Sequence, residues 1–547
     1  MRVGAAPLHT PADRAFAAHS LRRETSPEPL AFHQWGGITL DLRLCCSPAS
    51  LTGGDCLRCG RDAYEKRTTQ RRQEPSGAAG MTNTDSQQPA AEDPSSSHRV
   101  TWLHRATPEP TGGSGPARRD DAWVEQMLAA VEPWRAPPVG ATWDPQPVRH
   151  GGRTAALDAV AAIDPAAYAR TRNHLDGAIT RLSPWLRHGV LSTAEVRDLA
   201  LSRVAQPADA EKLISELAWR DYWQRVYASL GEQIFDDLEP AAAASRLPAS
   251  DEVPSDVLSA STGMACIDAF VRQLHTTGFL HNHARMWLAS WLIHARGVRW
   301  HAGAAWFLSH LLDADPASNA LSWQWVAGTF SSKPYMFNRE NLDRYTSGRF
   351  CQSCSLAGHC DLEGSYDELA AAWFAETAAE RPRLRIPPEA AWLPASASAA
   401  GTSADPVVWL TLNSLAETTP AAVRYPAAAR VFLIDPAWLA REQPSRLRLR
   451  FILECLAEVG RLDLGIGPTA AGVAEAIDHH QAAGAAVATT PCPFDRKAAE
   501  ALGATTFLEV LTGPQLVDAK RVADLGRFSR YWSKVRSSAM RPSDATG

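Results

Sequence analysis

The sequence of 547 residues lacks any long apolar run. No stretch approaches the roughly 18 consecutive apolar residues that a membrane-spanning helix needs. The first residues also lack an apolar segment with a basic flank and a small-residue cleavage site, so we expect a cytoplasmic protein. In a reducing compartment the ten cysteines are better suited to be thiols or metal ligands than disulfides.

An excess of charge of either sign is also missing. The formal net charge is −5, so the whole chain does not have the basic footprint typical of nucleic-acid-binding proteins. A surface that binds DNA must therefore be local. Tryptophan, in contrast, is abundant, with nineteen residues, many of them between Trp219 and Trp325. Each of these side chains can serve either in packing or as an electron carrier.

The length predicts more than one domain, because single hydrophobic cores stop growing near about 250 to 300 residues. The composition along the chain divides it into a polar tail, a helical domain, a linker rich in Pro, Ala and Ser, an α/β domain and a second tail. We expect these parts at residues 1–97, 98–385, 386–406, 407–515 and 516–547, in that order.

The first tail lacks sustained periodicity and ends in the polar run 82–97, which cannot bury enough apolar surface to become ordered. Met81 opens this run, and the natural start of the chain can lie there. Cys56 and Cys59 form a CxxC pair in this tail, and we interpret it as incidental because it stands alone in unstructured sequence.

Hydrophobic periodicity separates the two folded domains. From about Asp120 to Ala371 apolar residues recur at helical spacing, which predicts an all-α domain. After the linker, β-rich runs alternate with helical segments, which predicts βαβ units and a parallel, Rossmann-like sheet. The expected strands are 407–412, 430–434, 485–489 and 505–511, and the expected helices between strands are 447–459 and 473–483.

Three blocks of the helical region combine polar and aromatic residues. Residues 176–192 offer hydroxyls and Arg181 where a helix begins, an arrangement that suits either a phosphate or an ordinary helix cap. Glu216, Trp219 and Arg220 lie at positions i, i+3 and i+4 of the next helix, and so share a face. A surface ion pair beside a core tryptophan explains that face equally well. Residues 278–286 repeat the pattern with Asn282, Arg285 and Met286.

The fourth block, residues 310–325, contains two aspartates, an asparagine and two tryptophans in apolar sequence. Buried carboxylates are costly unless a partner compensates their charge. We therefore expect Asp313 and Asp315 to face a buried polar ligand.

The four blocks, in this order and spacing, resemble the flavin domain of DNA photolyases and cryptochromes from about Trp102 to Ala371. The resemblance implies an all-α domain that binds FAD, with Arg285 paired to Asp313 and Asn319 beside flavin N5. It implies that the cofactor is held by Thr180, Leu182, Ser183, Arg220, Asn282, Arg285, Asp313, Asp315 and Asn319. The family usually has Thr-Ser where this chain has Ile179-Thr180, so one hydroxyl contact is missing.

The same resemblance implies that damaged DNA is the partner and that blue light drives its repair. Trp219, Met286 and Trp325 match the residues that pack a flipped pyrimidine dimer, and Glu216 matches the residue facing the adenine and the damaged bases. Asn282 stands where the (6-4) repair enzymes carry histidine, which favours a cyclobutane dimer. The alternative is a cryptochrome-like photoreceptor that acts through a signalling partner, without repair.

Trp323 and Trp300 match the two inner members of the family's photoreduction chain. No tryptophan occupies the usual place of the third member, between Tyr227 and Gly263. Photoreduction must therefore proceed through another aromatic residue or be impaired.

Cys351, Cys354 and Cys360 form a compact triplet, and Cys266 can supply a fourth thiolate from upstream. Four thiolates hold an iron–sulfur cluster or a zinc ion. The arrangement is similar to bacterial photolyases with a [4Fe–4S] cluster, which is our first expectation; zinc and free thiols are the alternatives.

The α/β domain follows the helical domain, whereas in photolyases an α/β domain comes first and can hold an antenna pigment. A rearranged antenna domain with an unidentified antenna chromophore is therefore a further expectation. A partner-binding domain without pigment is the alternative, and no glycine-rich fingerprint indicates a separate dinucleotide site.

Overall fold

The structure is a computed structural model that describes residues 99–106, 119–140, 143, 150–377, 384–388, 404–522 and 524–543. These residues all fall in one compact unit, Glu92–Gly547. The expected tail 1–97, with Met81, Cys56 and Cys59, lies outside the described residues, as does most of the expected linker 386–406. No described helix is long and apolar enough to cross a membrane.

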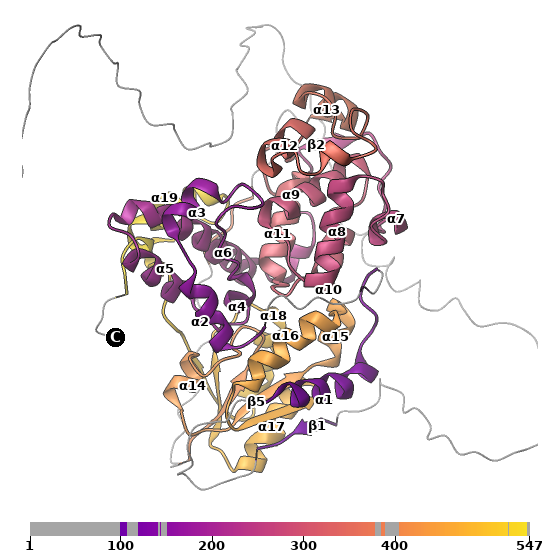
Figure 1. The fold of residues 1–547 in the computed structure, drawn as a ribbon. Helices are drawn as coiled ribbons and strands as arrows, with labels where there is room; N and C mark the ends of the chain where they lie inside the picture. Colours follow the sequence, from indigo (N-terminus) through magenta and orange to yellow (C-terminus); the bar gives the residue numbers. More distant parts are fainter. Residues whose placement is uncertain are drawn as a thin grey trace, which may run out of the picture. The chain divides into compact units, whose positions relative to one another are not determined.

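A helical region occupies the middle of the chain, as the periodicity predicted (Figure 1). A two-stranded antiparallel ribbon, β2 (Ala243–Ser245) with β3 (Phe374–Thr377), lies at its edge. Its helices are α2 (Arg153–Ala161), α3 (Pro165–Thr171), α4 (Ser183–Arg187), α5 (Thr193–Ser202), α6 (Glu211–Leu230), α7 (Ser255–Leu258), α8 (Ala265–Thr277), α9 (Asn282–Ser290), α10 (Trp300–His310), α11 (Pro316–Ala327), α12 (Arg339–Thr346) and α13 (Tyr366–Trp373).

Local signals explain where the important helices begin and end. Asp315 caps α11 by accepting a hydrogen bond from the Ala317 N–H, and Pro316 occupies the first helical position, where its missing N–H costs nothing. The helix ends at Gly328, whose φ of 86° favours a residue without a Cβ. Helix α10 packs on α11, which holds the two helices side by side.

The α/β region forms the six-stranded sheet β1-β6-β5-β4-β7-β8, parallel except for β1. Because β4 neighbours both β5 and β7, the strand order reverses there, which is where open α/β sheets bind ligands. Its elements are β4 (Val407–Leu410), α14 (Pro420–Arg424), β5 (Arg430–Ile434), α15 (Pro436–Glu442), α16 (Arg446–Ala457), β6 (Leu462–Ile466), α17 (Thr469–His480), β7 (Gly484–Ala488), α18 (Pro493–Gly503) and β8 (Phe507–Leu511).

The start of the described chain belongs to this sheet, although the sequence placed residues 98–385 in the helical domain. Strand β1 (Thr101–His104) pairs antiparallel with β6, and α1 (Asp121–Val131) packs on α16. In Figure 1 these indigo elements lie beside the orange and yellow elements of the sheet. Val124, Leu128 and Val131 form the buried face of α1. Such a face has the same helical periodicity whichever region it packs on, so periodicity alone could not reveal which region α1 joins.

The segment that follows the α/β region packs on the helical region. Helix α19 (Phe528–Ala539), in the expected C-terminal tail 516–547, packs on α6. Tyr531, Val535 and Ala539 are buried in this contact, and the Tyr222 hydroxyl donates to the Leu525 carbonyl at 2.8 Å. Residues 516–522 and 524–543 are therefore part of the folded unit.

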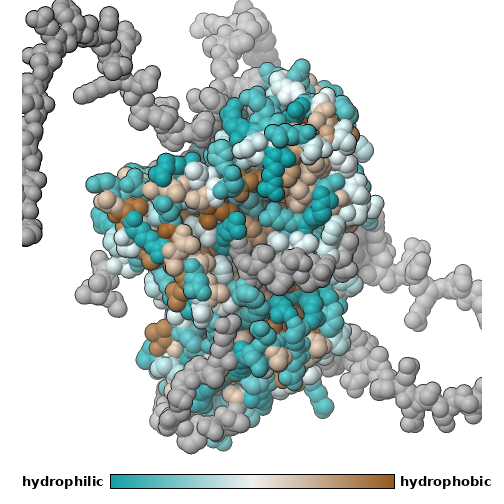
Figure 2. All heavy atoms as spheres, viewed as in Figure 1, coloured by the Kyte–Doolittle hydropathy of each residue, from teal (hydrophilic) through white to brown (hydrophobic). Residues whose placement is uncertain are grey.

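The surface is mainly polar, with scattered apolar residues on the face drawn in Figure 2. Among the described residues, the exposed large apolar side chains are Leu157, Leu247, Tyr366 and Val423. Such isolated residues are ordinary for a globular protein.

Candidate functional site

Helices α6, α9 and α11 each present one face to a cavity of about 290 Å³, which we call the helical cavity. Its lining residues recur at helical spacing, as expected where helix faces meet at a ligand site. From α6 come Leu213, Glu216, Leu217, Trp219, Arg220 and Trp223; from α9 come Asn282, Arg285, Met286 and Ala289; from α11 come Ser318, Asn319, Ser322, Trp323 and Val326.

Most of the predicted site residues meet in this cavity. It is lined by Thr180, Ser183, Glu216, Trp219, Arg220, Asn282, Arg285, Met286, Asp313, Asp315, Asn319 and Trp323. Leu182, Trp300 and Trp325 are not among its lining residues. Leu182 is buried at the start of α4, and Trp325 packs against Tyr335 with ring centroids 5.4 Å apart.

Arg285 and Asp313 form a bidentate ion pair at the cavity wall. The Arg285 guanidinium donates to the two Asp313 carboxylate oxygens at 3.2 and 2.9 Å, and to the Leu280 carbonyl at 3.1 Å. This is the pair that the resemblance implied. Because Asp313 is buried, removal of either partner leaves a charge without compensation.

Asp315 organises the wall rather than facing a ligand freely. One carboxylate oxygen accepts from Arg220, from Gln224 at 2.6 Å and from Ser318 at 3.0 Å, while the other caps α11. Burial tends to raise the pKa of Asp315, but Arg220, Arg187 and these hydrogen bonds outweigh burial and hold the pKa below its ordinary value. Asp315 therefore stays ionised and fixes the Arg220 guanidinium.

Asn319 is oriented by the neighbouring helix. Its side-chain nitrogen donates to the Ala304 carbonyl of α10 at 2.9 Å. Since a carbonyl oxygen can only accept, this contact identifies the NH₂ side of the amide. One N–H and the amide oxygen remain for a ligand in the cavity.

Trp219 carries an aromatic partner that the sequence did not predict. Phe528 of α19 stacks on its ring at a centroid distance of 3.7 Å and an angle of 12°, and Trp223 lies 5.1 Å away. Glu216 pairs with Lys212 at 2.8 Å and with Arg172 at 3.4 Å. In this conformation both residues already have protein partners.

The four predicted metal-ligating cysteines converge on one small cavity, the thiol cavity. Cys266, Cys351, Cys354 and Cys360 all line it, although α8 and the segment after α12 are far apart in sequence. Burial and the neighbouring Cys351, Cys360 and Cys354 raise the pKa of Cys266 to about 12. Within the described ranges no three His, Cys, Asp or Glu side chains are arranged to hold a single metal ion.

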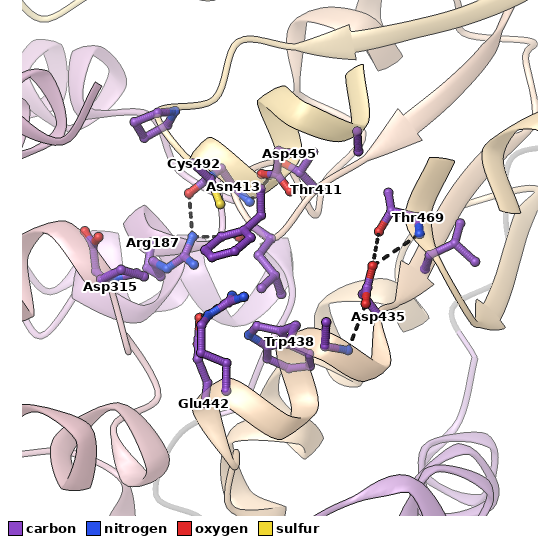
Figure 3. Close-up of a pocket in the computed structure, with 18 of the residues that line it drawn as sticks. Arg187, Asp315, Thr411, Asn413, Asp435, Trp438, Glu442, Thr469, Cys492 and Asp495 are labelled. Atoms are coloured by element: carbon purple, nitrogen blue, oxygen red, sulfur yellow. Dashed lines mark hydrogen bonds and ion pairs between the residues drawn. The ribbon is translucent and has the colours of Figure 1, made fainter. Parts of the chain in front are cut away.

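A larger cavity, of about 420 Å³, lies where the sheet meets the helical region, and of its lining residues the sequence predicted Asp315 alone as a site residue. We call it the sheet-edge cavity. Figure 3 shows Arg187 and Asp315 of the helical region on one side, with Trp438, Asp435 and Asp495 of the α/β region on the other. It lies at the carboxyl ends of β4, β5 and β7, the position favoured for ligands in such sheets.

The sheet-edge cavity holds polar groups that are not fully used by the protein. The buried indole N–H of Trp438 lacks a hydrogen-bond partner. Burial raises the pKa of Asp495 to about 6, although the Thr490 hydroxyl donates to its carboxyl at 2.9 Å. Trp409, Phe432 and Phe494 add aromatic walls. An unpaired donor beside aromatic faces suits a planar ligand with a polar edge.

The central part of the chain matches a known protein family. Residues 213–384 match the family described as the FAD binding domain of DNA photolyase. The deoxyribodipyrimidine photo-lyase of Streptomyces griseus is 41% identical over 152 residues, which are 28% of this chain and 32% of that protein. The chloroplastic/mitochondrial cryptochrome DASH of Oryza sativa subsp. japonica is 35% identical over 186 residues, 33% of this chain and 31% of that protein. The matches thus span about a third of the curated relatives.

Two solved structures resemble part of the chain. A bacterial class III photolyase from Agrobacterium tumefaciens is 30% identical, with 40% of this chain and 50% of that chain covered and a TM-score of 0.33. An archaeal photolyase from Sulfolobus tokodaii, solved with two FAD molecules, is 26% identical, with 39% and 49% covered and a TM-score of 0.31. Residues 213–384 thus match the family described as the FAD binding domain of DNA photolyase, and the curated relatives that resemble part of the chain are named photolyase and cryptochrome DASH.

Proposed function

We propose that the protein repairs cyclobutane pyrimidine dimers in DNA, as a deoxyribodipyrimidine photolyase driven by blue light. The observation that carries the proposal is the helical cavity, where the faces of α6, α9 and α11 bring together the residues matched to the family's cofactor and lesion contacts. FAD in this cavity supplies light absorption and one-electron transfer to a dimer.

The side chains of the cavity suit FAD. Arg220 and Arg285 supply cations, Thr180 and Ser183 supply hydroxyls for the phosphates, and Trp323 supplies an aromatic wall. Asp315 holds Arg220 in place, and Asp313 holds Arg285, so both guanidinium groups are oriented before the cofactor binds. Asn319 offers an amide where the family places the residue beside flavin N5.

The residues proposed for the lesion side of the cavity come from the resemblance to the photolyase family. Met286 and Trp219 pack the flipped dimer, and Glu216 accepts hydrogen bonds from its bases. Stacking on an aromatic face is what an extruded base requires. Damaged DNA is accordingly the proposed partner.

The experiment that tests this function uses the full chain after chemical reduction. A dimer-containing oligonucleotide is illuminated with blue light, and the loss of dimer is measured by chromatography. We expect dimer loss that requires both light and the reduced protein. An intact dimer with fully reduced FAD present rejects the repair function.

One observation favours a second candidate, a photoreceptor without repair activity. Phe528 covers one face of Trp219, and Trp325 is not among the residues that line the helical cavity, so two of the expected lesion contacts are incomplete in this conformation. A photoreceptor shows light-dependent FAD reduction, equal affinity for damaged and undamaged DNA, and no dimer loss.

We also propose a [4Fe–4S] cluster in the thiol cavity. Four thiols from two distant segments surround one void, and this donor set fits the cluster. Elemental analysis after anaerobic purification should give iron and acid-labile sulfide in equal amounts, lost in Cys354→Ser. Stoichiometric zinc, or no metal, rejects the cluster.

The sheet-edge cavity is the proposed site of an antenna chromophore. Its aromatic walls, the Trp438 N–H and the Asp495 carboxyl suit a planar pigment. We expect purified wild-type protein to release a second pigment. A smaller amount of this pigment bound to Trp438→Ala supports this site. Retention of that pigment at the wild-type level in Trp438→Ala rejects it.

A further inference from the structure

Trp300 is a buried tryptophan whose indole reaches an exposed acid. It opens α10 and is 5% exposed, while its indole N–H donates to the Asp237 carboxylate at 2.7 Å. Asp237 lies just after the short helix Gly231–Phe235 and is exposed to solvent. The hydrogen bond therefore joins a buried ring to bulk water through one carboxylate.

Helix α10 also packs on Trp323, a residue of α11 that lines the helical cavity. Trp323 lines that cavity and packs on Gly303, which lies one turn after Trp300 on α10. A Cβ at Gly303 would lie 2.3 Å from the Trp323 ring, so only a glycine lets the indole approach the backbone so closely. Trp323 therefore contacts α10 one turn after Trp300.

Oxidation changes the acidity of an indole. A tryptophan that loses one electron becomes an acid about as strong as a carboxylic acid, whereas the neutral residue hardly dissociates. A carboxylate that already accepts a hydrogen bond from the indole can therefore take the proton from the oxidised ring. No large motion is needed, because the hydrogen bond already exists.

We propose that Asp237 is the proton acceptor that makes the oxidation of Trp300 long-lived, and thereby replaces the absent third tryptophan. This inference rests on the proposed function, because it concerns how FAD is reduced by light. With FAD bound in the helical cavity, Trp323 would give up one electron on illumination, and Trp300 would return one electron to Trp323. The N–H bond of Trp300 then breaks, its proton passes to Asp237, and a neutral tryptophan radical remains.

The step is balanced and needs one external reductant. One electron would have passed to the bound FAD and one proton to Asp237. The proton then leaves Asp237 for the solvent. An exogenous thiol then restores Trp300 by supplying one electron and one proton. The imidazole of His301, stacked on Trp300 at 3.8 Å, does not extend the chain because it is much harder to oxidise than indole.

The test compares Asp237→Asn with Asp236→Asn in the FAD-loaded protein. Asparagine still accepts the indole hydrogen bond but is far too weak a base, and Asp236 is the neighbouring exposed acid. Transient absorption separates the protonated from the neutral tryptophan radical. We expect Asp237→Asn to slow deprotonation by roughly 10²-fold, the lower end of what a positioned base contributes, and to increase charge recombination.

Deuterium substitution gives a second kinetic readout. Deprotonation of oxidised Trp300 in wild type and in Asp236→Asn should be slower in D₂O than in H₂O. In Asp237→Asn the decay of oxidised Trp300 should follow charge recombination and be nearly equal in the two solvents. Equal neutral-radical yield and rise time in all three proteins overturns the proposal. Dimer loss by chemically reduced protein does not require this route, so it tests the proposed function separately.

The hydrogen bond can also be examined without FAD. In the ¹⁵N-labelled protein the Trp300 indole proton should be shifted downfield and protected from exchange, and Asp237→Asn should move this resonance while leaving the others in place. An indole proton that exchanges as fast as an exposed one contradicts the geometry on which the proposal rests.

Discussion

At the scale of single residues, the two buried aspartates of the helical cavity have different tasks. Asp313 makes one bidentate pair with Arg285, whereas Asp315 is saturated by four donors and caps α11. The sequence indicated that both carboxylates needed compensation, because burial of a lone charge is costly. It could not indicate that Asp315 serves mainly to orient Arg220, since that depends on the close approach of α6 and α11.

Trp219 should govern the preference for damaged DNA. Base stacking contributes about 1 to 3 kcal/mol per aromatic contact, so Trp219→Ala should weaken binding of a dimer-containing duplex by roughly 5- to 150-fold. Trp219→Phe, which keeps an aromatic face, should lose much less. Fluorescence anisotropy measures both, with FAD content as the control for folding, and equal affinity of the Ala variant and wild type excludes the stacking role.

Asp495 should make stability depend on pH. Its folded pKa is about 6 and its ordinary pKa is 3.8, so the folded state binds the proton more tightly, and stability at this site falls as pH rises through this interval. Asp495→Asn should therefore gain about 1 to 3 kcal/mol relative to wild type at pH 7 and little or nothing at pH 4. Urea unfolding at several pH values measures this difference, and a gain independent of pH contradicts it.

At the scale of helices and strands, sequence periodicity predicted the faces that build the cavity. Asn282, Arg285 and Met286 were expected on one side of a helix, and they line the cavity from α9. The expected strand 430–434 coincides with β5. Strand β6 was missed, because Asp463 and Gly465 interrupt its apolar run.

The structure explains both interruptions. The Asp463 carboxylate is fully buried and accepts from the Ala106 N–H at 2.8 Å and pairs with His480 at 2.9 Å. A Cβ at Gly465 would approach a Val100 methyl to 2.9 Å. The antiparallel partner of β6 is β1, which lies about 360 residues earlier in the chain, so local sequence could not indicate this pairing.

Helix α19 should stabilise the helical region through Phe528. Because Phe528 is half-buried and stacks on Trp219, Phe528→Ala should lower the free energy of unfolding by about 1 to 3 kcal/mol. The neighbouring exposed Ser529, changed to Ala, should stay within about 0.5 kcal/mol of wild type. Urea unfolding compares the three proteins, and equal stability of both variants contradicts the proposed docking of α19.

At the scale of the whole molecule, the two regions predicted as separate domains share one folded unit. His188 contacts the Leu412 carbonyl at 3.0 Å and the Leu312 carbonyl at 3.2 Å, and the Leu415 N–H donates to the His188 carbonyl at 2.8 Å. Arg448 of α16 donates to the Leu308 carbonyl of α10 at 2.7 Å. Composition could divide the chain, but these long-range contacts are invisible in it.

The shared contacts predict that the helical and α/β regions unfold together. Far-UV circular dichroism, near-UV circular dichroism and FAD fluorescence should give coincident thermal transitions, as expected for one cooperative unit. Two resolved transitions, with FAD released in only one of them, would show that the regions are energetically independent.

The measurement that tests the account most directly is the identity and amount of flavin bound to the full chain. The buried Arg285 and Asp313 pair predicts that wild type retains stoichiometric FAD, that Asp313→Ala and Arg285→Ala lose it, and that the exposed control Glu340→Ala keeps it. Breaking such a pair costs about 3 to 5 kcal/mol. Chromatography and mass spectrometry of the released cofactor decide the matter. FAD at the wild-type level in both pair variants, or folded wild type that cannot be loaded with FAD, contradicts the central claim.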